Sequence, residues 1–204
     1  GLEPVSYFSQ STNLYYKLVP TSDWPTIALG SVPMHRIKSP KQDTFNKINL
    51  LKPYGIVLDT CMGLGYTAIG ASKEARQVIT FERDETVYMI AQLNPYSKDL
   101  FSSSNIEVRR QDIAENIGFF SDSYFDCIIH DPPTFKLSPE LYSSNFYKEL
   151  LRILKPKGKL FHYTPFYKVK RGYDFPSKVE KKVKEAGFRN IKFSDKASGL
   201  LCQR

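Results

Sequence analysis

Short apolar runs alternate with helix-like stretches along the chain from Ile56 onward. The apolar runs are short enough for buried strands, and the stretches between them carry apolar residues at helical spacing. The predicted strands are Ile56–Leu58, Val78–Phe81, Ile106–Arg110, Phe125–His130, Lys159–Tyr163, Ile191–Phe193 and Gly199–Cys202. The predicted helices are Tyr66–Arg76, Glu85–Leu93, a short helix from Ile113, Leu141–Leu154 and Lys178–Ala186, with Gly187 as the C-cap of the last. This alternation favours an α/β fold with a parallel sheet wound by helices on both faces.

The first fifty residues differ from the rest, because aromatic residues are crowded between prolines. A chain of 204 residues is long enough for one well-buried domain and too short for two ordinary ones. We therefore expect residues 1–42 to form an N-terminal extension packed on the core and residues 43–204 to form the single domain. A helix is expected from Asp43 to Leu51 at the start of that domain.

The sequence VLDTCMGLG, from Val57 to Gly65, ends a strand in an acid and places two glycines in the turn before a helix. A cofactor that lies across the carboxyl edge of a parallel sheet needs such a turn. Gly63 and Gly65 would let the backbone approach the ligand, and Asp59 could meet a cationic or hydroxyl group. The spacing is not that of the dinucleotide motif GxGxxG. A tight turn of some other α/β protein is the alternative.

Acids also follow the second and third strands. Glu82 is the first residue past an apolar run, where a carboxylate can accept hydrogen bonds from both hydroxyls of a ribose. Because Arg83, Asp84 and Glu85 are charged too, an ordinary exposed acid is the alternative, but the position of Glu82 favours the ribose role. Asp112 stands before a short helix, where an N-cap is the alternative to a binding role.

Two consecutive prolines follow the fourth apolar run in the sequence DPPTF, from Asp131 to Phe135. They force an extended, rigid turn and remove two N–H donors. Their carbonyls and the Asp131 carboxylate would form a fixed set of acceptors, which suits the exocyclic amine or ring N–H of a nucleobase. Phe135 offers a face on which a base can stack. A proline-rich turn without a chemical role is the alternative.

Together, these motifs resemble those of class I S-adenosylmethionine (SAM)-dependent methyltransferases, in order and spacing, from Leu50 to Thr164. VLDTCMGLG is similar to the family's DxGxGxG motif with Cys61 at the first glycine, a residue that some RNA methyltransferases also carry there. DPPTF looks like the fourth motif of amino- and nucleobase methyltransferases, including the guanine-N7 half of bifunctional bacterial large-subunit rRNA methyltransferases and a family of predicted archaeal methyltransferases.

The resemblance implies a doubly wound, Rossmann-like sheet of seven strands with the last strand antiparallel, and SAM as the cofactor. In this family the acid or amide after the third strand binds the adenine amino group, and the next residue borders the ring. The cofactor-binding residues so implied are Asp59, Cys61, Gly63, Gly65, Glu82, Arg83, Asp112, Ile113 and Asp131. The catalytic residues so implied are Asp131, Pro132 and Phe135.

Methyl transfer from a sulfonium is an in-line displacement, so the protein mainly positions and desolvates the reactants. Asp131 and the carbonyl of Pro132 would hold the acceptor nitrogen with its lone pair toward the methyl group. Cytosine-C5 methylation would need a thiolate nucleophile. Cys127 lies inside a strand and is expected in the core, so we discount that chemistry. His130 is expected to be a packed residue; a role as partner of Asp131 is the alternative.

The formal net charge of +8 favours a polyanionic partner, most simply RNA, with solubility as the alternative. Aromatic and basic residues interleave after the fifth strand, which suits base stacking and phosphate contact, although a basic surface loop would look similar. The substrate-binding residues expected there and at DPPTF are Phe135, Tyr167, Lys168, Lys170 and Arg171. We expect methylation of an RNA base nitrogen; a protein or small-molecule substrate, and a non-catalytic RNA- or partner-binding subunit, remain alternatives.

Other classes of site are not expected from the sequence. No window approaches the ~20 apolar residues of a membrane span, and the start of the chain lacks the pattern of a signal peptide. The three cysteines have no metal-ligand spacing, which predicts reduced thiols, no metal site and a cytoplasmic protein. The sequence leaves the oligomeric state open.

Overall fold

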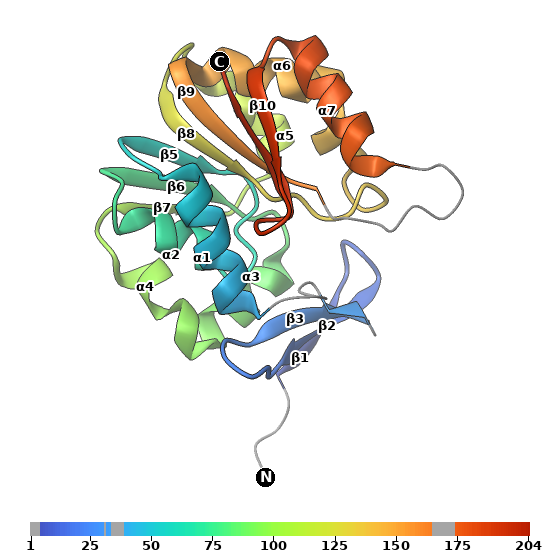
Figure 1. The fold of residues 1–204 in the computed structure, drawn as a ribbon. Coiled ribbons are helices and arrows are strands. Elements are labelled where there is room, and N and C mark those ends of the chain that lie inside the picture. The colour runs from blue at the N-terminus through green and yellow to red at the C-terminus, as the bar shows by residue number, and fades with distance from the viewer. Residues whose placement is uncertain (1–4, 31, 34–38, 165–173) are drawn as a thin grey trace.

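The computed structural model describes residues 5–30, 32–33, 39–164 and 174–204. Its centre is a seven-stranded sheet in the order β10-β11-β9-β8-β5-β6-β7 (Figure 1). The strands are β5 (Ile56–Asp59), β6 (Gln77–Phe81), β7 (Ile106–Arg109), β8 (Phe125–His130), β9 (Leu154–Tyr163), β10 (Arg189–Ser194) and β11 (Gly199–Gln203). Strands β5 to β9 pair in parallel, whereas β11 lies between β9 and β10 and runs antiparallel to both. The expected sheet with an antiparallel last strand is confirmed.

Helices cover both faces of this sheet, as expected for a doubly wound fold (Figure 1). The helices are α1 (Pro40–Leu51), α2 (Tyr66–Ser72), α3 (Glu85–Leu93), α4 (Lys98–Ser102), α5 (Ile113–Asn116), α6 (Ser144–Ile153) and α7 (Phe175–Ala186). Successive strand residues serve opposite cores: Val57 packs with α1 to α4, and Leu58 with α5 to α7. Burial of both faces explains why these strands are continuous apolar runs.

Local capping chemistry sets several helix boundaries. The side chain of Asp84 accepts hydrogen bonds from the N–H groups that begin α3, and Ser143 does the same for α6. The cap at Ser143 splits the predicted helix Leu141–Leu154, so that its first residues form a short 3-10 helix, Pro139–Tyr142. Gly187 ends α7 with φ of 115°, which confirms the predicted C-cap.

Residues 5–30 and 32–33 form a small antiparallel sheet that the sequence did not reveal. Its strands are β1 (Ser6–Ser9), β2 (Leu14–Val19), β3 (Thr26–Leu29) and β4 (Val32–Pro33). This sheet lies beside α3 (Figure 1). Its loop from β2 to β3 packs Trp24 against Tyr66 of α2, with 4.9 Å between ring centroids. No helix among the described residues is long and apolar enough to cross a membrane.

Candidate active site

The residues singled out by the motifs follow the carboxyl ends of four neighbouring parallel strands. Asp59, the last residue of β5, lies level with Thr80 of β6 and Ile129 of β8. Glu82 comes just after β6, Asp131 just after β8, and Asp112 between β7 and α5. Because parallel strands end at a common edge, one rim of the sheet gathers these carboxylates, where open α/β sheets bind ligands.

The turn after β5 needs both of its glycines. Gly63 has φ of 54° and Gly65 has φ of 78°, a left-handed backbone that side chains disfavour. A Cβ atom on Gly65 would lie 2.5 Å from the Cδ2 atom of buried Leu100, so this glycine allows α2 to pack. A Cβ atom on Gly63 would meet nothing within 4 Å, so open space borders the turn at this residue.

Asp59 is fully buried, and only one of its two carboxylate oxygens accepts hydrogen bonds from the described residues. Its Oδ2 atom accepts hydrogen bonds from the hydroxyls of Thr80 (2.9 Å) and Thr67 (3.5 Å). Its Oδ1 atom has no partner among the described residues. Burial raises the pKa of Asp59 to about 8. A buried acceptor without a donor is costly unless a ligand supplies one, and a cationic amine or a hydroxyl would do so.

Glu82 is tied to the backbone through both carboxylate oxygens. Oε1 accepts from the N–H of Asp84 (2.8 Å) and Oε2 from the N–H of Gly63 (3.1 Å). Each oxygen keeps a second lone pair, which suits two neighbouring hydroxyl groups. Burial raises the pKa of Glu82 to about 7. The carboxylate is therefore held beside the glycine turn, and its ribose role stays a prediction.

Arg83 and Asp112 bind each other, with 2.9 Å between Nη1 and Oδ2. Arg83 also pairs with Glu140 at 2.8 Å and donates to the hydroxyl of Ser138, so its guanidinium joins the loop after β8 to the turn after β7. Asp112 is the N-cap of α5, and its Oδ1 atom accepts a hydrogen bond from the N–H of Ala114. The predicted N-cap alternative is therefore present. The cofactor roles of these two residues and of the buried Ile113 stay predictions.

The thiols near the site are poor nucleophiles. Cys61 lies in the turn after β5, and its sulfur lies 3.6 Å from the hydroxyl oxygen of Thr60. Burial raises the pKa of Cys61 well above its ordinary value, and burial also raises that of Cys127, a core residue of β8. Both thiols therefore stay protonated near neutral pH, and the exclusion of C5 chemistry stays a prediction.

His130 is a packed residue rather than a partner of Asp131. Its Nε2 atom lies 3.0 Å from the carbonyl of Leu141, so Nε2 carries the hydrogen, and Nδ1 accepts from the hydroxyl of Thr60 at 2.8 Å. Burial lowers the pKa of His130 to about 4, so the ring is neutral. It links the turn after β5 to the loop after β8.

Asp131 is held by a lysine that the motifs did not reveal. The Nζ atom of Lys47 on α1 lies 2.6 Å from Oδ2 of Asp131 and 2.6 Å from Oδ2 of Asp43. Burial acts to lower the pKa of Lys47, but the two carboxylates outweigh it and hold the pKa above its ordinary value. The spacing of Asp43 and Lys47, four residues apart on a predicted helix, was the one local signal; the partner Asp131 is 84 residues away.

The prolines after Asp131 are fixed by Tyr142. Its hydroxyl donates to the carbonyl of Pro133 at 2.8 Å and lies 3.5 Å from that of Pro132. Phe135 packs edge-to-face on Tyr142 with 5.8 Å between ring centroids, yet 49% of Phe135 is exposed. The DPPTF loop therefore presents an accessible aromatic ring, whose role in stacking a base stays a prediction.

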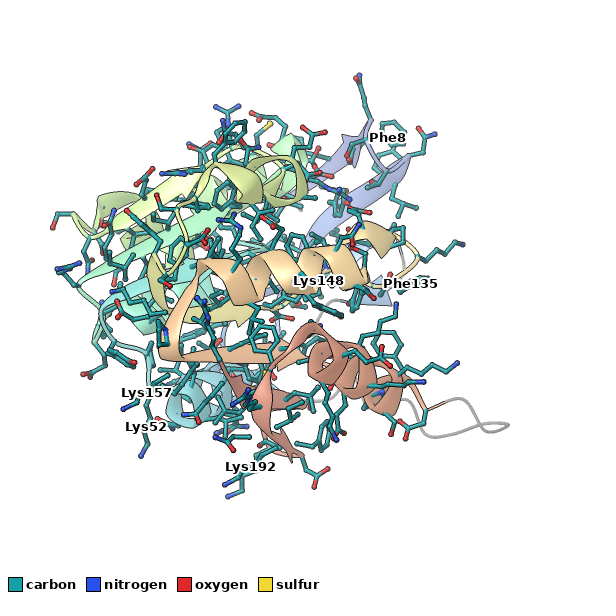
Figure 2. The ribbon with its side chains drawn as sticks, turned by 90° about the horizontal axis from the view of Figure 1, so that it is seen from above. Phe8, Lys52, Phe135, Lys148, Lys157 and Lys192 are labelled. Atoms are coloured by element: carbon teal, nitrogen blue, oxygen red, sulfur yellow. The ribbon has the colours of Figure 1, made fainter. Side chains whose placement is uncertain are left out.

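The remaining positive charge is spread over the molecule. Figure 2 shows Phe135 at the opposite end from Lys52 and Lys157, so these exposed cations do not border the site. The predicted substrate residues Tyr167, Lys168, Lys170 and Arg171 lie outside the described residues. Within the described part of the chain, no group of three or more His, Cys, Asp or Glu side chains could hold a metal ion.

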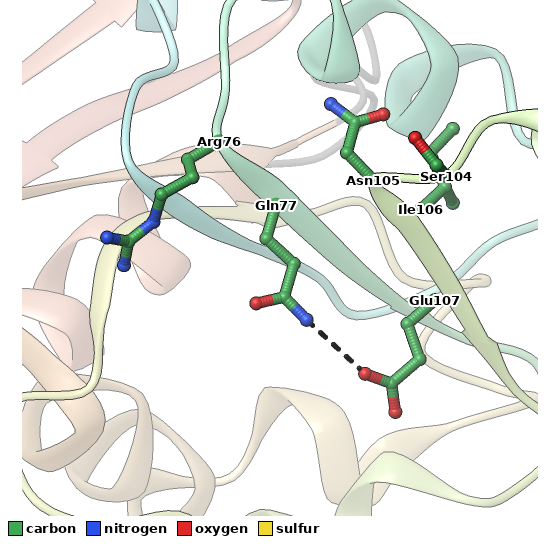
Figure 3. A pocket seen from close by; sticks show the side chains of 6 residues that line it. All are labelled: Arg76, Gln77, Ser104, Asn105, Ile106 and Glu107. Atoms are coloured by element: carbon green, nitrogen blue, oxygen red, sulfur yellow. Dashed lines mark hydrogen bonds between the residues drawn. The ribbon is translucent and has the colours of Figure 1, made fainter.

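A surface hollow of about 420 Å³ lies elsewhere, at the amino ends of β6 and β7 (Figure 3). Gln77 and Glu107 border it, with a hydrogen bond of 3.4 Å between their side chains. The carboxylates of the motifs follow the other ends of these parallel strands. This hollow is therefore distinct from the candidate active site.

Known proteins resemble the chain in sequence and in fold. An uncharacterized protein of Methanocaldococcus jannaschii is 47% identical over 197 residues, which cover 94% of this chain and 67% of that protein. A spermidine synthase in complex with the transition-state analogue AdoDATO has a TM-score of 0.76 and 18% identity, over 97% of this chain and 71% of that one. The tRNA (m1A58) methyltransferase TrmI of Aquifex aeolicus has a TM-score of 0.59 and 19% identity, over 78% of this chain and 57% of that one.

The two solved structures share the fold at low identity, and their substrates differ. The sequence match is more specific, because residues 84–191 match the family described as S-adenosyl-L-methionine-dependent methyltransferase. That stretch begins just after Arg83 and includes the whole of the DPPTF loop. The chain belongs to the S-adenosyl-L-methionine-dependent methyltransferase family, and its cofactor is SAM.

Proposed function

We propose that this protein transfers the methyl group of SAM to a nitrogen atom of an RNA base. The observation that carries the proposal is the carboxylate of Asp131, fixed at the cofactor edge by Lys47 and followed by the exposed ring of Phe135. A carboxylate accepts an N–H of the acceptor, and an aromatic ring stacks on the base that bears it.

The rim of the sheet fits the cofactor. The unpartnered Oδ1 atom of Asp59 suits the amino group of SAM, the open space at Gly63 leaves room for the ligand, and Glu82 suits the ribose hydroxyls. Bound SAM supplies an electrophilic methyl group on a sulfonium. The chain's own residues then need to orient the acceptor and exclude water.

The acceptor side needs no strong base. Asp131 would accept a hydrogen bond from the acceptor nitrogen and direct its lone pair toward the methyl group. A nitrogen–carbon bond forms as the sulfur–carbon bond breaks, and the nitrogen loses its proton after the transfer. Lys47 is paired with two carboxylates, and Cys61 and Cys127 stay protonated, so these groups are not the base or the nucleophile.

An RNA substrate is favoured by the net charge of +8 and by the stacking surface of Phe135. Tyr167, Lys168, Lys170 and Arg171 are proposed to contact the RNA next to the acceptor base. Because Lys52 and Lys157 lie at the far end of the molecule, their contribution would be to the RNA backbone rather than to the base (Figure 2).

A small amine is the second candidate acceptor. The similarity to the spermidine synthase covers 97% of this chain and so includes the small N-terminal sheet, whereas that to the tRNA methyltransferase covers 78%. An aliphatic amine would also donate to Asp131, but it would make no use of the exposed ring of Phe135.

The test is transfer of labelled methyl from SAM to total RNA from a strain that lacks the gene, followed by nucleoside mass spectrometry. Parallel reactions contain polyamines or the strain's protein extract, and Asp131→Ala is the inactive control. We expect label in a single methylated base that nuclease, and not protease, releases. Label in protein or polyamine but not in RNA would refute the RNA substrate.

A further inference from the structure

Lys47 is buried at the acceptor side of the site although it comes from α1, outside the motifs. Only 4% of its side chain is exposed, against 25% for that of Asp131. Its ammonium lies between the carboxylates of Asp43 and Asp131, at 2.6 Å from each. Residues 84–191, which match the family, do not contain Lys47, so the match assigns it no role.

The alternation of the strands explains why Lys47 meets Asp131. Ile129 and Phe161 pack in the core on the side of α1 to α4. Asp131 comes two residues after Ile129, and Tyr163 two residues after Phe161. Because side chains alternate between the faces of a sheet, both lie on the same face as α1 to α4. The Nζ atom of Lys47 lies 4.7 Å from the centroid of the Tyr163 ring. The ammonium is therefore enclosed by two carboxylates and one aromatic face.

This enclosure uses the hydrogen-bonding capacity of Lys47. Two of its three N–H directions go to carboxylates, and the third side of the ammonium faces the Tyr163 ring, a favourable cation–π contact. Of the two oxygens of Asp131, Oδ2 is bound to Lys47, whereas Oδ1 accepts no hydrogen bond from the described residues. Lys47 thus leaves one acceptor atom of Asp131 for a substrate.

We propose that Lys47 is a positioning residue, which holds Asp131 in the one orientation that presents Oδ1 to the acceptor nitrogen. The inference rests on the proposed methyl transfer at Asp131. Without Lys47 the Asp131 side chain, which is partly exposed, would turn among its rotamers and into water. A displacement of about 1 Å in a reacting group can cost roughly 100-fold in rate.

The experiment uses Lys47→Met in an Asp43→Asn background, because removal of Lys47 alone would take a positive charge away from the buried carboxylate of Asp43. Asp43→Asn alone is the reference variant. Lys159→Met is the matched control, since Lys159 also anchors α1, by donating to the carbonyls of Leu51 and Lys52, but does not touch the site. We expect kcat at saturating SAM to fall about 100-fold with Lys47→Met and to stay within about 3-fold with Lys159→Met.

A double-mutant cycle of Lys47→Met and Asp131→Asn separates a role of Lys47 in positioning Asp131 from a general loss of structure. If Lys47 acts through Asp131, its removal should change kcat by less than about 3-fold once Asp131 is asparagine, which still offers an acceptor oxygen. An equal loss with aspartate and with asparagine would overturn the inference. If the acceptor is not RNA, the same cycle is measured with the acceptor that the wild-type protein methylates.

A second readout does not depend on activity. The Nζ hydrogens of an enclosed lysine exchange slowly with water, so Lys47 should give a sharp ¹⁵N–¹H ammonium resonance at neutral pH. Asp131→Asn should weaken or remove that resonance, whereas Lys159→Met should not. An unchanged resonance in Asp131→Asn would show that Lys47 does not hold Asp131, whatever the substrate is.

Discussion

Asp59→Asn is expected to stabilise the protein in the absence of SAM, by an amount that depends on pH. The folded state raises the pKa of the fully buried Asp59 from 3.8 to about 8. Between these values the folded protein keeps a proton that the unfolded chain releases. The stability associated with Asp59 is therefore present below pH 4 and is lost as the pH rises toward 8.

The magnitude follows from the linkage. Each pH unit between the two pKa values costs the wild-type protein about 1.4 kcal/mol, so Asp59→Asn should gain about 3 kcal/mol relative to wild type between pH 5 and pH 7. The absolute gain is smaller, because an amide N–H at the unpartnered Oδ1 position would cost about 1–3 kcal/mol. The change of the stability difference with pH therefore tests the reasoning better than the stability difference at a single pH.

The assay is urea unfolding without SAM at pH 5, 6 and 7, for wild type, Asp59→Asn and Asp126→Asn. Asp126 is the control of opposite sign, because its ion pair with Lys155 at 2.8 Å and its bond to the N–H of Ile56 hold its pKa below the ordinary value. Asp126→Asn should therefore destabilise at all three values of pH. A gain for Asp59→Asn that is the same at pH 5 and pH 7 would refute the reasoning, since it would mean that Asp59 is already ionised in the folded protein.

Three further outcomes are expected. Asp131→Ala should abolish methyl transfer while SAM affinity, measured by isothermal titration, stays within about 3-fold; loss of SAM binding would show that Asp131 belongs to the cofactor site instead. Gly65→Ala should lower the free energy of unfolding by about 1–3 kcal/mol, because a left-handed φ and the contact with Leu100 both oppose a side chain, and a Tm unchanged from wild type would contradict this. SAM binding at pH 7 should release protons from Asp59 and Glu82, because their raised pKa values leave both carboxyl groups partly protonated at that pH, and titration enthalpies that do not vary with the buffer would exclude this.

The sequence predicted those parts of the fold that depend on neighbours along the chain. The bounds of β8 and α3 are those expected, because β8 is a continuous apolar run and Asp84 caps α3 directly. The small sheet of strands β1 to β4 was not predicted. Among its described residues few apolar side chains are buried, Tyr16 and Ile27 being two of them, so the alternation that marks a strand is weak.

The candidate site was predicted to the extent that its residues follow strand ends. Asp59, Glu82 and Asp131 are at one rim of the sheet because parallel strands share an edge. Contacts between segments that are far apart in the sequence could not be predicted. Lys47 meets Asp131 across 84 residues, and Arg83 meets Glu140 across 57, and neither spacing carries a periodic signal.

The place of β11 between β9 and β10 bears on how the chain folds during synthesis. A ribosome delivers β9 and β10 first, but β10 bonds only to β11 within this sheet, so it has no strand to join until residues 199–203 emerge. Until then the backbone groups along one edge of β9 have no neighbouring strand, and a strand of another chain could pair with them. The nascent sheet would therefore gain from a chaperone until residues 199–203 have emerged and paired with both strands.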